Sequence, residues 1–242
     1  MAGSCHDTQH MVVRPIGVLQ GDFGGRFGTP RQAGLTPSAR GVVLLTPPFA
    51  RAEALEGLAE YSHVWLLFWF HGNRAPVGRS LTVRPPRLGG NRRLGVFATR
   101  SPYRPNPIGL SLVRCAGMVQ EPGRFGLRVE GHDLIDGTPI LDIKPYLAYA
   151  DRVQQACVPA EFAGAPPTRL AVHFATEAME TLRRHPDGER LQRLIRETLA
   201  LDPRPVYRGC RGDGCHGMRL AGLEVRWRMR GKAAEVESLE AV

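Results

Sequence analysis

Carboxylates gather in one short stretch of the 242-residue chain. Asp133, Asp136 and Asp142 lie within ten residues, and Lys144 follows them closely. A carboxylate can accept a proton in general base catalysis or pair with a cation, so this stretch is a candidate for acid–base chemistry. Asp136 is followed by Gly137, a dipeptide typical of a hairpin turn, and a turn alone would account for that aspartate.

A second candidate is the loop Ser101–Pro107, which holds three prolines together with Tyr103 and Arg104. Prolines make such a loop rigid before anything binds, which lowers the entropy lost on binding. A stiff turn between two strands is the alternative interpretation. His63 and His71 bracket an apolar run, where a histidine is more often a core residue with its hydrogen bonds satisfied than a ligand.

Several familiar sites are missing from the sequence. It contains no GxGxxG fingerprint, no GxxxxGK[ST] loop and no GxSxG elbow, so a doubly wound nucleotide-binding domain is disfavoured. Cys210, Cys215 and His216 are the nearest approach to metal-ligand spacing, but no second pair follows, and we expect no metal. Five scattered cysteines fit a reducing compartment. The longest apolar run, Val64–Phe70, is far shorter than the roughly 20 residues of a membrane span, so we predict a cytoplasmic protein without a membrane partner.

The charge is strongly positive and unevenly placed. The 32 basic residues exceed the 23 acidic ones by nine, and all but Lys144 and Lys232 are arginines. Biased base composition of the genome could explain part of that excess. No acidic residue lies between Glu60 and Glu121, however, and this interval holds nine arginines. Segregation of this kind predicts a polyanionic partner, because guanidinium groups hold phosphates bidentately. The nine are Arg74, Arg79, Arg84, Arg87, Arg92, Arg93, Arg100, Arg104 and Arg114.

Short apolar runs broken by glycine or proline recur through the first 158 residues and predict a β-rich domain. One helix, about Arg51–Tyr61, interrupts them, and His63–Phe70 is apolar on both faces, which predicts a fully buried strand. The other predicted strands are Met11–Val18, Gly41–Leu45, Leu94–Thr99, Gly109–Met118 and Phe125–Glu130.

A smaller α+β module is predicted after a proline-rich linker at residues 159–168. Residues 170–174 alternate as a strand, and Thr176 is placed to cap a helix that ends near His185. Leucines and an isoleucine at helical spacing predict a second helix over 191–199, and residues 223–229 alternate as another strand. The predicted domains are residues 11–158 and 168–242.

Five blocks in order resemble the TsaA-like (TrmO) family. That resemblance implies a closed N-terminal β-barrel that binds S-adenosylmethionine and acts as a homodimer on tRNA. The reaction it implies is methylation of N6 of threonylcarbamoyladenosine, at position 37 next to the anticodon. The blocks are RFGTPRQ, YSHVWLLFWFH, RPPRLGGNRRLGVFATRSPYRPNPIGLSLV, DLIDGTPILDIKPY and DPRPVYR.

Carried over residue by residue, the resemblance implies a set of cofactor contacts. Gly72 stands where a relative has glutamine, so only its backbone is expected to contribute. The implied contacts are Pro30, Arg31, Gln32, His71, Gly72, Arg100, Leu110, Gly131, His132, Asp133 and Leu134.

The implied chemistry then gives the carboxylates a role. N6 of threonylcarbamoyladenosine is part of a urea-like group, so losing its proton would restore its nucleophilicity, and Asp133 or Asp136 is the expected general base. Asp142 is expected to pair with Lys144. Arg92, Arg93, Arg104 and Lys144 are the predicted RNA contacts, with Arg104 or Lys144 also a candidate for the threonyl carboxylate. A non-catalytic RNA-binding barrel is the main alternative, and a methyltransferase of this fold with another substrate is a third.

Overall fold

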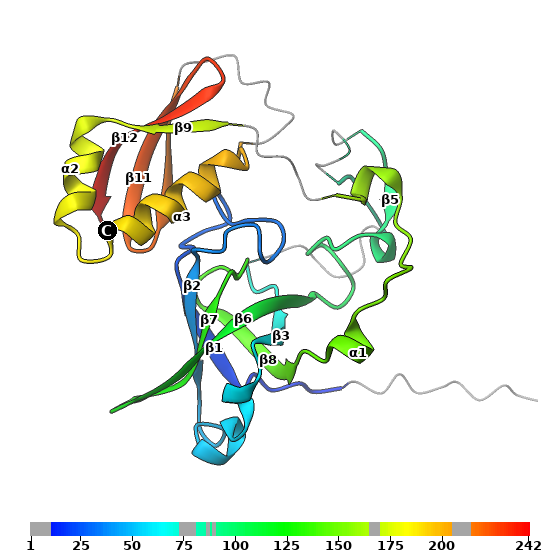
Figure 1. Ribbon diagram of the computed structural model, residues 1–242. Coiled ribbons are helices and arrows are strands. Elements are labelled where there is room, and N and C mark those ends of the chain that lie inside the picture. The colour runs from blue at the N-terminus through cyan, green and yellow to red at the C-terminus, as the bar shows by residue number, and fades with distance from the viewer. Residues whose placement is uncertain (1–10, 73–80, 86–87, 89–90, 165–169, 205–213) are drawn as a thin grey trace, which may run out of the picture.

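The computed structural model describes residues 11–72, 81–85, 88, 91–164, 170–204 and 214–242 (Figure 1). Six strands close into a barrel in the order β1-β2-β7-β6-β3-β8. Every neighbouring pair in it is antiparallel. The predicted closed barrel is therefore confirmed. Its strands are β1 (Gly17–Gly21), β2 (Arg40–Leu45), β3 (His63–Trp69), β6 (Ile108–Glu121), β7 (Arg124–Glu130) and β8 (Thr138–Pro145).

Alternation along these strands fills the barrel with apolar side chains. Leu19, Val43, Leu66, Val113 and Leu127 are all buried in one cluster, since every second residue of a strand points inward. The sequence predicted that β3 would be buried on both faces, and this prediction was wrong. Its outward residues remain partly accessible, because the outer face of a barrel needs no covering layer.

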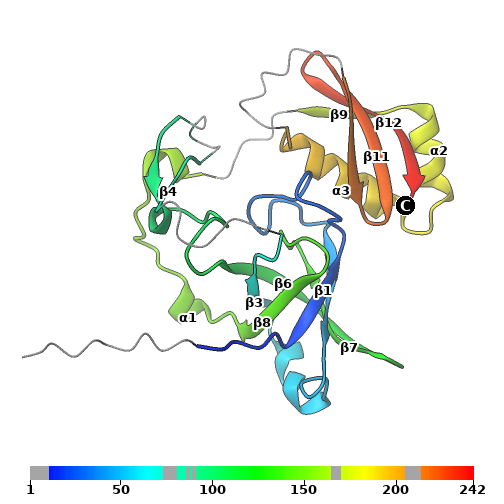
Figure 2. The same cartoon turned by 180° about the vertical axis from the view of Figure 1, so that it is seen from behind.

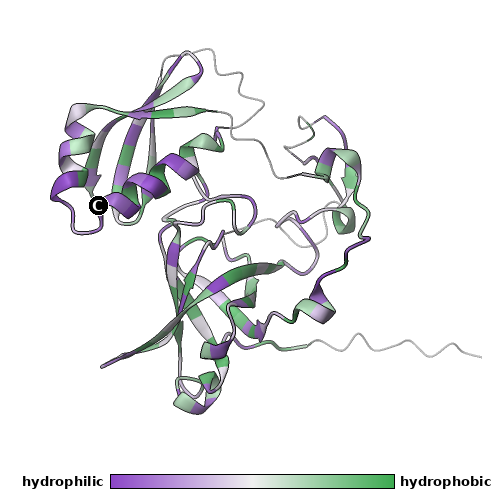
Figure 3. Cartoon of the chain, in the orientation of Figure 1, coloured by the Kyte–Doolittle hydropathy of each residue, from purple (hydrophilic) through white to green (hydrophobic). Residues whose placement is uncertain are grey.

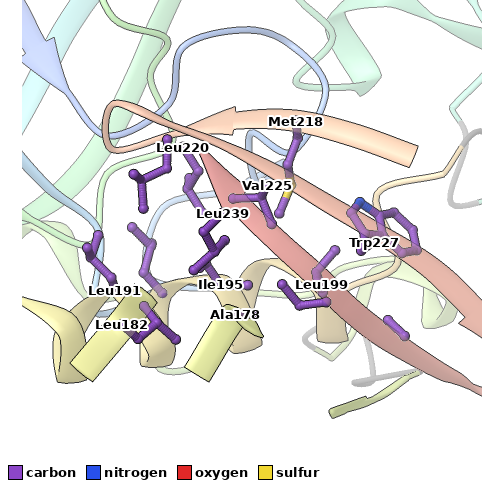
Figure 4. Close-up of a cluster of buried hydrophobic side chains, with 14 of the residues drawn as sticks. Ala178, Leu182, Leu191, Ile195, Leu199, Met218, Leu220, Val225, Trp227 and Leu239 are labelled. Carbon is purple, nitrogen blue, oxygen red and sulfur yellow. The ribbon is translucent and has the colours of Figure 1, made fainter. Parts of the chain in front are cut away.

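The C-terminal region is a four-stranded sheet, β10-β11-β12-β9, with α2 and α3 packed on it. Figure 4 shows side chains of both helices meeting those of the strands, with Trp227, which is fully buried, at one side of the cluster. Both helices carry hydrophobic and hydrophilic residues along their length (Figure 3), as amphipathic helices should. The elements are β9 (Ala171–Phe174), α2 (Thr176–Arg184), α3 (Gly188–Ala200), β10 (Cys215–Leu220), β11 (Leu223–Arg230) and β12 (Ala233–Ala241).

Several sequence predictions were wrong in detail. The expected helix over 51–61 is two 3-10 turns, η1 (Ala52–Leu55) and η2 (Leu58–Glu60), separated by Gly57 in a left-handed conformation that an α-helix does not contain. Thr176 is the first residue of α2 and makes no side-chain cap.

The predicted strand over 94–99 is the two-residue β5 (Leu94–Gly95), paired with β4 (Thr82–Val83) and followed by η4 (Val96–Ala98). Two short elements follow the barrel, α1 (Ala148–Asp151) and η5 (Ala160–Phe162).

Three connections leave the same end of the barrel. Because the pairing is antiparallel throughout, the β1–β2, β3–β6 and β7–β8 connections all start from that end, which we call the loop end. Two views from opposite sides (Figures 1 and 2) show the C-terminal region beyond the loop end, with the β1–β2 connection between them. The predicted cofactor residues, apart from Leu110, all lie in these three connections.

Candidate active site

The β1–β2 and β7–β8 connections are tied together by backbone hydrogen bonds. The amide of Gly34 donates to the carbonyl of Gly131 at 2.8 Å, and the amide of Gly131 donates to the carbonyl of Ala39, also at 2.8 Å. These bonds bring the predicted cofactor segment at residues 30–32 beside the turn that carries Asp133. Residues about 100 positions apart in sequence thus share one site.

Asp133 lies at the centre of this arrangement. Its carboxylate accepts a hydrogen bond from Oγ of Ser111, on β6, at 2.6 Å. Burial raises the pKa of Asp133 to about 6, although the Ser111 hydrogen bond, the charge of Arg100 and the amide of Ala33 each oppose that rise. A carboxylate with this pKa is ionised at neutral pH and more basic than an ordinary aspartate, as a general base requires.

Arg100 and Gln32 join the third connection to the first. Nη1 of Arg100 donates to Oε1 of Gln32 at 2.7 Å, and the Gln32 amide donates in turn to the carbonyl of Arg31. The three connections therefore meet at Gln32, Arg100 and Asp133, which the sequence predicted as one cofactor site.

The side chain of His132 is buried behind the turn that carries Asp133 and is held by hydrogen bonds at both ring nitrogens. Its side chain is fully buried against Phe23, Nε2 lies 2.9 Å from the carbonyl of Arg40, and Nδ1 accepts the amide of Leu134 at 3.3 Å. This pattern requires the neutral tautomer with hydrogen on Nε2, and burial lowers the pKa of His132 accordingly. Leu134 is also buried, so neither His132 nor Leu134 presents its side chain to a ligand.

Asp136 has a different environment from Asp133. Its carboxylate accepts the amide of Gly21 at 3.0 Å, and its own amide donates to the carbonyl of Phe23 at 2.8 Å. Gly137 follows with φ of 77°, which glycine adopts without strain. Asp136 is exposed and organises a turn, but the predicted hairpin was wrong, because β7 and β8 are not neighbours in the barrel.

The remaining predicted cofactor residues are arranged unevenly. His71 is exposed, and its Nε2 lies 4.0 Å from where a Cβ on Gly137 would stand, while Gly72 lies beside Ile135. Both therefore border the β7–β8 turn. Leu110 is 52% exposed and points to the outer face of β6, opposite to its neighbour Ser111. Its side chain is thus not part of the cluster around Asp133.

The predicted RNA contacts are already engaged within the chain, except that Arg93 is simply exposed. Arg92 pairs with Glu161 at 2.8 Å on the surface, and Nη1 of Arg104 donates to the carbonyl of Thr99 at 3.1 Å. Lys144 pairs with Asp142 at 2.9 Å, which confirms the predicted ion pair.

Lys144 lies toward the end of the barrel away from Asp133. It is opposite Trp65 on β3, about six residues and about 20 Å along β8 from the loop end. Arg104 is therefore the better placed of the two candidates for the threonyl carboxylate.

Sequence reasoning missed Ser111. The signal was a hydroxyl at an inward position of an otherwise apolar strand, where a buried polar group needs a partner. Of the suspected thiol loop, Cys210 lies outside the described residues, Cys215 begins β10, and His216 stacks on Trp227 at 4.5 Å.

Comparison with known proteins identifies the family. The model of the tRNA-methyltransferase O N-terminal domain matches residues 18–152, and that of the TrmO C-terminal domain matches residues 167–242. The chain belongs to the TrmO family. A crystal structure of TrmO from Pseudomonas aeruginosa superposes with a TM-score of 0.77 at 41% identity, covering 98% of this chain and all of that one.

Two similar TrmO-family sequences extend over nearly the whole chain. The tRNA (adenine(37)-N6)-methyltransferase of Escherichia coli K12 is 44% identical over 93% of this chain and 96% of its own length. A Pseudomonas aeruginosa protein, provisionally named S-adenosylmethionine-dependent methyltransferase RcsF, is 50% identical over 89% of this chain and 91% of its own.

Proposed function

We propose that this protein transfers a methyl group from S-adenosylmethionine to N6 of adenosine 37 in tRNA, with N6-threonylcarbamoyladenosine as the reacting nucleoside. The observation that carries the proposal is the partly buried carboxylate of Asp133, with a pKa of about 6, beside Gln32 and Arg100 in a chain of the TrmO family. Family membership supports the reaction, and the three residues supply groups that it needs.

The groups at the loop end fit S-adenosylmethionine chemically. Arg100 offers a cation for the carboxylate of its amino-acid part, and the side-chain amide of Gln32 offers a donor and an acceptor for its polar groups. When bound, this cofactor supplies a methyl group already activated by a positively charged sulfur. The protein therefore needs to align the two reactants rather than activate the methyl donor.

Asp133 is the general base of the proposed mechanism. In its ionised form it accepts the proton of N6, which frees the nitrogen lone pair for attack on the methyl carbon. Ser111 keeps the carboxylate oriented and favours its ionised form. Asp136 is bound to the Gly21 amide and is assigned to the turn instead.

Arginines on the β3–β6 connection are proposed to bind the tRNA. Arg92 and Arg93 are exposed, and a surface ion pair such as Arg92–Glu161 is worth little, so Arg92 can exchange its partner for a phosphate. Arg104, which is held against the carbonyl of Thr99, is proposed to bind the threonyl carboxylate. A tRNA substrate also supports a cytoplasmic location.

A homodimer completes the proposal. The outer face of the β3–β6 pair exposes three large apolar side chains at the loop end: Trp69 (41%), Ile108 (37%) and Leu110 (52%). Grouped apolar exposure is typical of a protein interface. Light scattering should give a dimer mass for the wild type and a monomer mass for Leu110→Asp, and a monomeric wild type would contradict this part of the proposal.

A non-catalytic RNA-binding barrel is the competing function, and cofactor binding separates the two. S-adenosylmethionine should raise the melting temperature of the purified protein, because a ligand that binds only the folded state stabilises it. If millimolar cofactor gives no thermal shift, with tRNA present or absent, the competing function is favoured.

A further inference from the structure

The β1–β2 connection is held from two sides. One side is the barrel, through the bonds between Gly34, Ala39 and Gly131 described above. The other is the C-terminal region, and its contacts involve two charged residues of α3, Arg190 and Glu197. This second set of contacts lies outside the site derived above.

Arg190 binds the start of the β1–β2 connection. Its Nη1 lies 2.6 Å from Oδ2 of Asp22, and both side chains are only 10% exposed. Nη1 also donates to the carbonyl of Ser38 at 3.2 Å, and Nε donates to Asp187 at 2.5 Å. A buried guanidinium with this many acceptors is geometrically fixed, and so is the carboxylate that it binds.

Glu197 binds the end of the β1–β2 connection. Oε2 accepts the amide of Ser38 at 3.0 Å, and Oε1 accepts the Ser38 hydroxyl at 2.8 Å. One carboxylate thus holds both the backbone and the side chain of the same residue. Ser38 is only five residues beyond Ala33, whose amide faces Asp133.

Apolar contacts add to this docking. Phe23 and Ala39, the second and second-to-last residues of the 22–40 segment, are buried in the core of the C-terminal region rather than in that of the barrel. Phe23 bridges to Leu220 on β10, and the amide of Ala221 donates to the carbonyl of Asp22 at 2.6 Å. The segment carrying Gln32 is therefore anchored at both of its ends on the C-terminal region.

A continuous chain of hydrogen bonds runs from α3 to the turn of Asp133. Oδ2 of Asp22, which binds Arg190, also accepts the amide of Arg40 at 2.6 Å. The carbonyl of Arg40 faces Nε2 of His132 at 2.9 Å, and Nδ1 of His132 accepts the amide of Leu134. Asp133 stands between these last two residues.

We propose that Arg190 and Glu197 are positioning residues for methyl transfer: α3 holds the β1–β2 connection so that Gln32 and Ala33 meet Arg100 and Asp133. The proposal rests on the proposed function of that site. It assigns the C-terminal region a direct part in forming the cofactor site, in addition to whatever it contributes to binding tRNA.

The test uses the full-length chain with Glu197→Ala, Glu197→Gln and Arg190→Lys. Glu189→Ala is the matched control, because Glu189 lies on the same helix in a surface pair with Arg193 and is 94% exposed. Hydrogen exchange followed by mass spectrometry should show faster exchange at residues 30–39 and 131–134 in Glu197→Ala, with the barrel strands unchanged.

Cofactor affinity, measured by calorimetry, should fall about tenfold in Glu197→Ala. Glu197→Gln should give an intermediate loss, because its amide oxygen still accepts one hydrogen bond. Glu189→Ala should match the wild type in every measurement. A folded Glu197→Ala variant with wild-type exchange in the connection and wild-type cofactor affinity would overturn the proposal.

Two further outcomes of these experiments also bear on the proposal. If Arg190→Lys does not fold, Glu197→Ala decides alone, because its contacts with Ser38 are only partly buried. If the wild type binds no S-adenosylmethionine, the proposed function fails, whereas exchange at residues 30–39 still decides whether α3 orders the connection. Unchanged exchange would then reject the positioning role as well.

Discussion

Two aspartates three residues apart have opposite surroundings in this protein. Asp133 is partly buried and held by a hydroxyl, and Asp136 is exposed and bound to a backbone amide. Both were equal candidates for the general base on sequence grounds, because the amino-acid types and the turn motif do not reveal burial. Because of this difference in environment, the proposed mechanism gives proton transfer to Asp133 and turn formation to Asp136.

This assignment predicts different effects of the same substitution. Asp133→Asn should lower the single-turnover methylation rate about 10²- to 10⁴-fold, the range typical of losing a general base, while cofactor still binds. Asp136→Asn is the matched control and should keep a near-normal rate, because its amide oxygen can still accept the Gly21 amide. Equal rates in the two variants would contradict the assignment.

Stability should also report on Asp133. Its pKa in the folded state, about 6, is above its ordinary value of 3.8, so the folded protein holds this proton more tightly than the unfolded chain. Ionisation between about pH 4 and pH 6 therefore costs stability. Urea unfolding should show Asp133→Asn gaining on the wild type as the pH rises through this interval, and a constant difference would show that the carboxyl is not perturbed.

Ser111 offers a test through pH dependence. Its hydrogen bond stabilises the ionised form of Asp133, so Ser111→Ala should raise the pKa of that carboxyl further. The acidic limb of the pH–rate profile should then move to higher pH, with the rate recovered above it. A profile that falls equally at all pH values would instead indicate that Ser111 acts on binding or folding.

At the level of secondary structure, strands with strict alternation were predictable and those with other roles were not. The sequence located β7 and β11 closely, because apolar residues at every second position mark a buried face, and it located β2 and β3 as short, continuous apolar runs. β8 was predicted as a candidate catalytic segment rather than as a strand, because it carries the charged residues Asp142 and Lys144. In the structure both lie on the outer surface of the barrel. β10 and β12 were missed, since β10 has only two buried apolar residues, Met218 and Leu220, and the alternation of β12 is broken by a bulge between Val236 and Leu239.

The candidate site, like the strands, could be predicted only in part from the sequence. The sequence blocks named Gln32, Arg100 and Asp133, but they did not show which of the named side chains face one another. His132 is an example: its motif is in the site, whereas its ring supports the turn from behind. The contacts of Arg190 and Glu197 join parts of the chain about 160 residues apart, and no local pattern predicts them.

Close packing between strands gives a prediction at this scale. A Cβ on Gly126 of β7 would stand 1.9 Å from the carbonyl oxygen of Val43 on β2, so Gly126→Ala should force the two strands apart. We expect a loss of about 1–3 kcal/mol in urea unfolding, as for other overpacked sites. Gly95→Ala is the control, because a Cβ on Gly95 would meet nothing within 4 Å, and equal stability of the two variants would contradict the strand packing described here.

At the scale of the whole molecule, the exposed arginines are expected to affect tRNA binding but not cofactor binding. Replacing Arg92 and Arg93 together by alanine should weaken tRNA binding and flatten its dependence on salt, by about 0.9 in log–log slope for each duplex phosphate that the variant no longer neutralises. Cofactor affinity should stay unchanged, because neither side chain contacts the cluster around Asp133. Weaker cofactor binding with an unchanged salt slope would place these arginines in the pocket instead.

Among the described residues, no helix combines the length and the apolar character needed to cross a bilayer. The molecule presents a barrel with three connections at one end, arginines on the longest of them, and a C-terminal region docked beside the candidate site. The candidate site, the arginines proposed to bind tRNA and the docking contacts therefore share one end of the barrel.

The central claim is tested most directly by the methylated product. The purified protein should be incubated with S-adenosylmethionine and tRNA that carries N6-threonylcarbamoyladenosine at position 37, and the nucleosides should then be analysed by mass spectrometry. We predict that this nucleoside gains the mass of one methyl group on N6, and that Asp133→Asn slows the gain while Asp136→Asn does not. Cofactor binding without methylation of that nucleoside, or methylation at another position, would contradict the account.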